Sequence, residues 1–284
     1  MTLINDRQFD EFFRPYSANV EGFYQAAYWK LSDELIKELI RRHLAVKPGD
    51  RVLDAGGGTG RWALWLASDQ NVQVTVADKS GAMLERARHN LATADKADQV
   101  ELLQCDLHDA PHLPSGVFDA VISTYGVLSF LDEPQAVFHT LYRAMRPGAA
   151  GLLMSHSLST ALSAKLSRDL ASPDELRELV ARKVVRWAPG VPPLRAFSAQ
   201  DLTDLATTAG FAVDGVFGVT TLVVPGAEDF GYPYSEISQV SRALEDAEFF
   251  RTALELELAA SENPGWAERG VNLMIKMRKP ERDS

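Results

Sequence analysis

Apolar positions along the chain fall into two patterns, short runs and stripes at helical spacing. Short apolar runs are typical of strands buried in a parallel sheet, and stripes at i, i+3 and i+4 indicate amphipathic helices. The two patterns alternate through residues 45–157. This alternation predicts an α/β fold in which helices cover a doubly wound, mostly parallel sheet. The runs predicted to be strands are 52–54, 72–78, 100–107, 117–126 and 152–157.

The segment ahead of the first strand is predicted to be helical. A stripe at Leu31, Leu35 and Leu39 indicates a helix that ends before the turn at 47–50. Residues 1–30 hold more aromatic side chains than one packing face requires. We therefore expect this segment to close over the site as a lid.

Beyond residue 157 the pattern becomes irregular. Ser172-Pro-Asp-Glu175 is a capping box ahead of a short helix at 176–180, and the proline-rich stretch 187–193 is hostile to a helix. We interpret two insertions, the second of which carries Tyr232 and Tyr234, as one cap over the carboxyl edge of the sheet. The other predicted elements are a helix at 202–209, a strand at 211–219, a long helix from about Ser238 to Ala260 and a last strand at 271–278.

Composition narrows the class of protein. The 284 residues are 46% hydrophobic and 24% charged, as in a soluble globular domain. A net charge of −10 and a pI near 5.1 argue against a broad phosphate-binding surface, and basic pairs such as Arg41-Arg42 and Arg182-Lys183 are expected on solvated helix faces. The single cysteine, Cys105, suits a reducing compartment. Because neither a signal pattern nor a membrane-spanning stretch is present, we expect a cytoplasmic protein with no membrane partner.

One stretch, Arg51-Val-Leu-Asp-Ala-Gly-Gly-Gly-Thr-Gly60, carries most of the chemical information. A strand runs into Asp54 and a glycine cluster, and a helix begins at once. Glycines allow the backbone to turn with positive φ and to approach a ligand closely. Taken alone, the stretch also fits a dinucleotide fingerprint over 58–63 or a purely structural turn. A P-loop is excluded because no Gly-Lys-Ser/Thr follows.

The spacing Asp54-x-Gly56-x-Gly58-x-Gly60 resembles the first motif of the class I S-adenosylmethionine-dependent methyltransferases. Asp78 ends the second strand at about the distance at which a carboxylate binds ribose hydroxyls. In that family, positions matching Asp106 and Leu107 hold the adenine. Arg146-Pro-Gly resembles a family turn, although alanine replaces its second glycine. Acids at successive strand ends favour this family over the dinucleotide interpretation.

The resemblance, strong over about 45–157, implies a fold and a cofactor. The fold would be a seven-stranded Rossmann-like sheet with α-helical cap inserts, and the cofactor S-adenosylmethionine, with S-adenosylhomocysteine as product. The chain then divides into an N-terminal helical lid (1–44), a cofactor-binding core (45–157), a cap insert (158–197) and a C-terminal part of the core (198–284) with a second insert at about 220–270.

The resemblance also implies site residues. His156, at the end of the fifth strand, is the best-placed general base, which is needed only if the acceptor loses a proton. The histidines and the cysteine show no zinc spacing, so we expect no metal. Acceptor contacts are expected from Tyr24, Tyr125, Leu128 and Trp187. Cofactor contacts are expected from Asp54, Ala55, Gly56, Gly58, Gly60, Asp78, Lys79, Met83, Cys105, Asp106, Leu107, Ser123 and Tyr28.

Three functions follow as hypotheses. The first is methyl transfer to O, N or C of a small organic acceptor, a metabolite or natural-product intermediate. The second is methylation of a modified tRNA nucleotide, because the second insert, the helix around Glu257 and the closing strand resemble transferases that esterify a wobble uridine. The acidic pI argues against it, so we expect no nucleic-acid partner. The third is a cyclase or binding protein that keeps the cofactor without methylating. The sequence leaves open whether the chain forms a homodimer.

Overall fold

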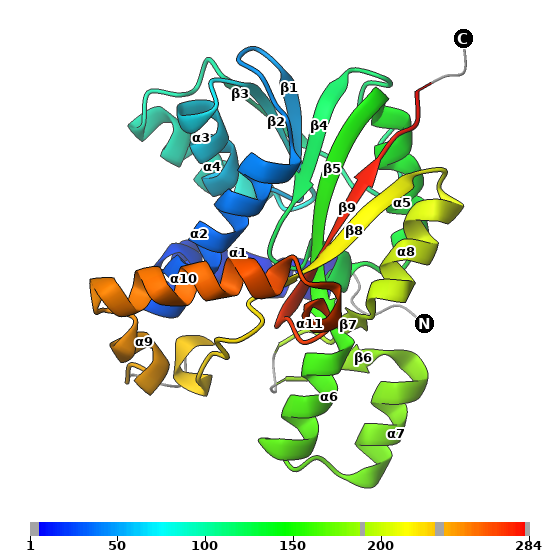
Figure 1. Ribbon diagram of the computed structural model, residues 1–284. Helices are drawn as coiled ribbons and strands as arrows, with labels where there is room; N and C mark the ends of the chain where they lie inside the picture. Colours follow the sequence, from blue (N-terminus) through cyan, green and yellow to red (C-terminus); the bar gives the residue numbers. More distant parts are fainter. Residues whose placement is uncertain (1–5, 188–190, 231–235, 282–284) are drawn as a thin grey trace.

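The computed structural model describes residues 6–187, 191–230 and 236–281. Its centre is the predicted sheet, in which β3, β2, β1, β4 and β5 run parallel in that order (Figure 1). Next to β5 lies β9, which pairs antiparallel with both β5 and β8. The strands of this core are β1 (Arg51–Ala55), β2 (Gln73–Asp78), β3 (Val100–Gln104), β4 (Phe118–Ser123), β5 (Met145–Ser157), β8 (Ala212–Val219) and β9 (Asn272–Arg278).

Helices cover both faces of the sheet, as the doubly wound prediction requires. Within β1, Val52 packs in the core under α2, α3 and α4, and the next residue, Leu53, packs in the core under α5 and α8. Because both faces are buried, the strands consist largely of apolar residues. The helices of these layers are α2 (Ala27–His43), α3 (Arg61–Asp69), α4 (Gly81–Thr93), α5 (Pro134–Ala144) and α8 (Ala199–Thr208).

Serine side chains cap the N-terminus of several helices. Ser80 accepts a hydrogen bond from the Met83 N–H at the start of α4, and Ser172 accepts one from the Glu175 N–H at the start of α7 (Pro173–Arg182). Ser198 and Asp201 form a reciprocal capping box on α8. The helices predicted at 176–180 and 202–209 therefore start earlier, directly after their cap residues.

The cap differs from the prediction in three respects. The described residues form nine strands, not seven, because the cap adds a ribbon of β6 (Val184–Val185) and β7 (Leu194–Phe197). A helix, α6 (Leu158–Ser167), occupies the start of the first insert, where no pattern predicted one. The long helix predicted from Ser238 to Ala260 is divided into α9 (Gln239–Ala243) and α10 (Ala247–Ser261), since Asp246 caps a new start. Tyr232 and Tyr234 lie outside the described residues.

The inserts gather at the end of the sheet where β5 finishes. Figure 1 shows the α6–α7 hairpin and the α9–α10 pair on two sides of that end, and α1 (Asp6–Phe23) behind it. β7 pairs with the last two residues of β5, His156 and Ser157, beyond the part of β5 that pairs with β4. The short elements η1 (Val127–Phe130), η2 (Ala227–Phe230) and α11 (Pro264–Ala267) lie in the connections. No described helix is long and apolar enough to cross a membrane.

A buried carboxylate attaches α10 to the segment that follows β8. Glu257 is fully buried, and its oxygens accept hydrogen bonds from the backbone N–H groups of Thr221 (2.6 Å), Leu222 (2.8 Å) and Val223 (2.5 Å). A carboxylate can satisfy several donors at once, which a neutral side chain of this size cannot do. The Glu-Leu-Glu-Leu stretch thus has a structural role in holding the second insert.

Replacing Glu257 should destabilise the protein. Glu257→Ala leaves three backbone N–H groups without their buried acceptor, and we expect a loss of about 3 kcal/mol in the free energy of unfolding. Urea denaturation followed by circular dichroism measures it. Glu255→Ala, at an exposed position on the same helix, is the matched control and should change stability by less than about 0.5 kcal/mol. Equal midpoints for the two variants would contradict the role of Glu257.

Candidate active site

A cavity of about 1050 Å³ lies at the carboxyl edge of the sheet. It reaches from the glycine turn after β1, past the ends of β2, β3 and β4, to the end of β5 and the cap. Aromatic side chains of α1 (Phe9, Phe12, Phe13 and Tyr16) form one wall. Ser159, Thr160 and Ser163 of α6 form another. The N-terminal segment therefore borders the cavity, as a lid would.

The glycine turn has the backbone conformation that the sequence predicted. Gly56, Gly58 and Gly60 have φ angles of +74°, +54° and +72°, in the left-handed region that favours glycine. A Cβ at Gly56 would lie 2.5 Å from a methyl carbon of Val127, so this position has no room for a side chain. The Gly58 N–H donates to Oδ2 of Asp78 at 2.9 Å, which joins the turn to the end of β2.

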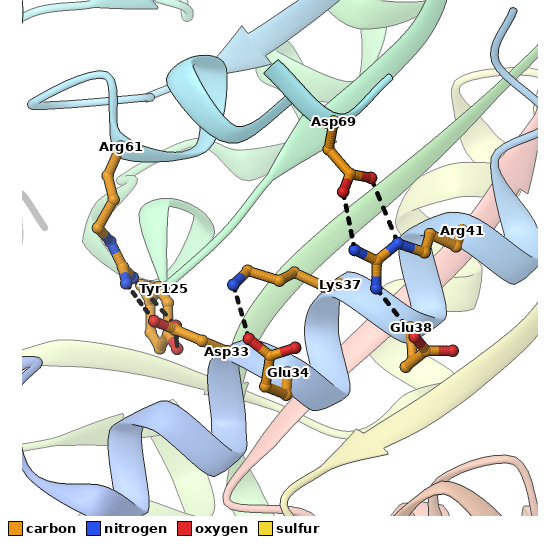
Figure 2. Close-up of polar contacts among 8 residues, drawn as sticks. All are labelled: Asp33, Glu34, Lys37, Glu38, Arg41, Arg61, Asp69 and Tyr125. Carbon is orange, nitrogen blue, oxygen red and sulfur yellow. Dashed lines mark hydrogen bonds and ion pairs between the residues drawn. The ribbon is translucent and has the colours of Figure 1, made fainter. Parts of the chain in front are cut away.

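Figure 2 shows an ionic cluster beside this turn that the sequence did not reveal. Arg61, the first residue of α3, donates both terminal nitrogens to Asp33 of α2, and the Tyr125 hydroxyl donates to the same carboxylate. The Arg61 guanidinium also stacks 4.1 Å from the ring centroid of Tyr24. Burial raises the pKa of Tyr24 and of Tyr125 well above the usual range, so both remain neutral phenols.

Tyr125 has an unusual backbone conformation. Its φ is +51°, and that of the following residue, Gly126, is +84°. A non-glycine residue in this region is uncommon and costs on the order of 1 kcal/mol. The strain directs the end of β4 so that Tyr125 packs against Tyr24, Trp29 and Trp62 at centroid distances of 5.1, 5.8 and 6.2 Å.

His156 lies at the end of β5 between β9 and the cap. Its Nδ1 is 3.0 Å from Oδ1 of Asn272, and its Nε2 accepts a hydrogen bond from the indole N–H of Trp187 at 3.0 Å. Burial lowers the pKa of His156, although the contact with Asn272 raises it. The imidazole is therefore neutral at pH 7.

Most predicted site residues border the cavity. Those on its wall are Gly56, Gly58, Asp78, Lys79, Met83, Cys105, Asp106, Leu107, Tyr24, Tyr125, His156 and Trp187. Asp54, Ala55, Gly60 and Ser123 lie directly behind the wall, where Ser123 Oγ donates to the carbonyl of Ala55 at 2.8 Å.

Two predicted positions are corrected. Tyr28 was expected to contact the cofactor, but its side chain is buried beside α9, and its hydroxyl is hydrogen-bonded to that of Thr220 (2.8 Å). Leu128 was expected to contact the acceptor, but it packs into the core under α5, while its neighbours Val127 and Ser129 line the cavity. In both cases the side chain completes a hydrophobic core.

Sequence reasoning missed three residues of the site, namely Asp33, Arg61 and Asn272. Arg61 had a weak signal, since it directly follows the last glycine at a helix start. Asp33 and Asn272 had none, because their partners are 28 and 116 positions away in the chain. Within the described part of the chain, no three or more His, Cys, Asp or Glu side chains are placed to hold a metal ion.

Comparison with known proteins decides the family. Residues 52–148 match the family model of a methyltransferase domain. The chain is 30% identical, over 173 residues, to the ubiquinone/menaquinone biosynthesis C-methyltransferase UbiE of Xanthomonas campestris pv. campestris, a match that covers 59% of this chain and 68% of that protein. The chain belongs to the class I S-adenosylmethionine-dependent methyltransferases.

Other relatives of this methyltransferase have different acceptors in their names. The tRNA 5-carboxymethoxyuridine methyltransferase of Escherichia coli K12 is 31% identical over 160 residues, which are 54% of this chain and only 58% of that protein. Among solved structures, a chain from the complex between the Haloferax volcanii Trm112 methyltransferase activator and a methyltransferase has a TM-score of 0.63. The two chains are 17% identical over 97% of this one and 99% of the other, a similarity that shows the fold.

The glycine turn and the buried acids fit S-adenosylmethionine, the cofactor of this family. Asp54, behind Gly57, is fully buried. The Ala63 N–H lies near its carboxyl group, but no described residue gives either oxygen a hydrogen bond of normal geometry. Burial, together with the Asp78 charge, raises the pKa of Asp54 to about 7. A buried carboxyl group in this state suits a ligand that carries an ammonium group.

The cavity is more polar at the end of β3. Asp106 receives the Lys79 ammonium at 2.8 Å and the backbone N–H of His108 at 3.0 Å. Burial opposes ionisation of Asp106, but these donors prevail and lower its pKa to about 2. Asp106 is therefore ionised at neutral pH and can accept further hydrogen bonds.

The raised pKa of Asp54 predicts a pH-dependent stability of the ligand-free protein. Between about pH 4 and 7 the native state binds a proton that the unfolded state has released, so the free energy of unfolding falls as pH rises through this range. Asp54→Asn should remove this contribution. The difference in stability between Asp54→Asn and the wild type should therefore shift in favour of the variant from pH 4 to pH 8, by an amount on the order of a few kcal/mol. Thermal unfolding across this range measures it. Asp174→Asn, at an exposed acid, is the control, and parallel wild-type and Asp54→Asn curves would contradict the prediction.

Proposed function

We propose that the protein transfers the methyl group of S-adenosylmethionine to a small organic acceptor held between the sheet, α1 and the cap. The cavity supports this proposal. Its volume of about 1050 Å³ is at the upper end of what one drug-sized ligand fills, so it can accommodate the cofactor and a small acceptor together. Aromatic residues of α1 on its wall favour an organic skeleton over a highly charged one.

Individual cofactor contacts are part of the proposal. Asp78 accepts the ribose hydroxyls at the end of β2, and Asp106 with Leu107 holds the adenine at the end of β3. Asp54, buried behind the turn, attracts the ammonium of the methionine part through its charge. Arg61 uses its donors that are not committed to Asp33 to bind the carboxylate of the same part, because a guanidinium has five N–H groups.

The reaction demands orientation above all. A sulfonium methyl is already electrophilic, so the protein must align the acceptor atom, the methyl carbon and the sulfur, which is worth several kcal/mol. The cluster of Tyr24, Tyr125 and Arg61 is held by hydrogen bonds and ring contacts that restrict its side chains. Such a rigid wall can exclude water from the methyl group and fix the acceptor beside it.

A tRNA acceptor is the second candidate, and the relative that modifies tRNA favours it. Surface charge argues against it. In Figure 2 the Arg41 guanidinium is held by Asp69 (3.1 Å) and by Glu38 (2.9 Å). Arg42 pairs with Glu262, Arg182 with Glu178, and Lys183 with Asp201. Phosphate binding relies on basic groups that are free to replace counterions. The four basic side chains named here are instead paired with acidic side chains.

Cofactor binding should depend on Asp78. Asp78→Ala removes a charge-assisted acceptor for the ribose, and we expect S-adenosylhomocysteine to bind about 2–4 kcal/mol more weakly. Isothermal titration calorimetry measures the affinity. Asp69→Ala, at an acid on the surface end of α3, serves as the control. Because Asp78 also holds Gly58, the melting temperature of each variant should be recorded. A well-folded Asp78→Ala protein with normal affinity would refute the contact.

The acceptor class can be tested directly with methyl-labelled S-adenosylmethionine. A metabolite extract and total tRNA are offered in separate reactions, with Asp78→Ala as the inactive control. We expect enzyme-dependent label in the small-molecule fraction and none in the RNA. Label in the RNA would establish the second candidate instead. Tight cofactor binding without any labelled product would refute methyl transfer in favour of a non-methylating role such as a cyclase.

A further inference from the structure

His156 has a hydrogen-bonding arrangement that determines which of its nitrogens carries the proton. The indole N–H of Trp187 can only donate, so Nε2 of His156 must be the acceptor in their 3.0 Å contact. The remaining proton of the neutral ring is then on Nδ1, which donates to Oδ1 of Asn272 at 3.0 Å. The imidazole therefore has its only basic lone pair directed at the cap.

Both partners of His156 are held in place. Asn272 is buried and directly opposite His156 in the β5–β9 pairing. The backbone N–H of His156 donates to Oγ of Ser129 at 2.9 Å. The Trp187 ring meets the imidazole edge to face at 5.6 Å. The cations of Lys165 and Arg168 lie 5.7 and 5.6 Å from the centre of the same indole ring. Trp187 is thus supported by α6, and His156 by the sheet.

Both side chains line the cavity, so the Trp187 N–H occupies a position that a ligand in the cavity can take. An incoming group that replaces it must offer a hydrogen-bond donor to Nε2, since otherwise a buried acceptor is left without a partner. A hydroxyl does this, whereas a carboxylate has no proton to donate and a C–H group is a weak donor. An aliphatic amine is an ammonium ion at neutral pH, which has N–H donors but no lone pair to attack the methyl carbon.

We propose that the acceptor is a hydroxyl compound whose O–H replaces the Trp187 N–H at Nε2 of His156, and that His156 is the general base of the methyl transfer. This inference rests on the function proposed above. The hydroxyl oxygen forms the new O–C bond with the methyl carbon, and the C–S bond breaks with its electron pair left on sulfur. The hydroxyl proton passes to Nε2, and the imidazolium later releases it to water.

The arrangement suits a base. Burial keeps the imidazole neutral before the reaction, and the Nδ1–H bond to Asn272 holds the ring in the required tautomer. After proton transfer, the Asn272 amide oxygen continues to accept from Nδ1 and stabilises the cation. Trp187 is a specificity residue, since it covers Nε2 against compounds that cannot replace its N–H.

The first test needs no acceptor. Diethyl pyrocarbonate acylates unprotonated imidazole nitrogens, and peptide mass spectrometry separates His156 from the five other histidines. With S-adenosylhomocysteine bound, Trp187→Phe should raise the rate of modification at His156 about tenfold, the factor corresponding to one lost hydrogen bond. Trp266→Phe, which changes an exposed tryptophan outside the cavity wall, is the matched control. Equal rates in the wild type and in Trp187→Phe would overturn the occlusion of Nε2.

The second test uses the methyl-labelled product from the metabolite extract. His156→Gln should lower kcat by about 10²–10⁴-fold with the KM for S-adenosylmethionine unchanged. Calorimetry with S-adenosylhomocysteine shows that the variant is folded. The label should be on oxygen, in a methyl ether. A methyl ester, an N-methyl or a C-methyl product, or an undiminished kcat in folded His156→Gln, would overturn the inference. If the wild type forms no labelled product at all, the proposed function fails, while the acylation rates still decide whether Trp187 covers His156.

Discussion

The left-handed backbone of the glycine turn is the constraint on which the carboxyl edge of the sheet depends. It allows the chain to pass from β1 into α3 within a few residues, directly over Asp54. The turn contacts Val127 on one side and donates to Asp78 on the other, so that three neighbouring strands meet at one point. A side chain at Gly56 would separate them. The cavity, the buried acids and the position of Arg61 all follow from this close approach.

Buried carboxylates organise the rest of the site. Asp33 joins α2 to α3 and to the end of β4 through Arg61 and Tyr125. Glu257 joins α10 to the segment after β8, and Asp229 joins the next part of that segment to Ser238 and Ser241. Each of these acids is satisfied by several donors, which offsets the cost of removing a charge from water. Asp54 is different, since the described residues leave it without a normal hydrogen bond, and it is the acid best suited to a ligand.

The proposed acceptor side combines a rigid part with a part supplied by the cap. Tyr125 and His156 belong to strand ends of the sheet, whereas Trp187 comes from the segment between β6 and β7. Relatives of this chain carry different acceptors in their names, so membership of the family does not by itself identify the acceptor. In this chain the cap places the Trp187 indole donor on Nε2 of His156, and in the proposal above this contact selects the chemistry that the acceptor must offer.

The sequence by itself determined the features that depend on residues close together in the chain, namely the strands, the acids at their ends and the helix caps. Buried parallel strands are recognisable as apolar runs, and acids such as Asp78 and Asp106 come together because the carboxyl ends of parallel strands share one edge. Caps such as Ser172 act within one turn of a helix, so their positions could also be predicted.

Only the tertiary structure decided which side chains face the cavity beyond those strand ends. Tyr24 reaches it and Tyr28, four residues later in the chain, does not, because the packing of α2 against α9 and the segment after β8 directs Tyr28 to Thr220. Asp33 with Arg61, and His156 with Asn272 and Trp187, are likewise brought together from distant parts of the chain. Such pairs depend on the relative placement of whole elements, for which no periodicity or spacing along the chain carries a signal.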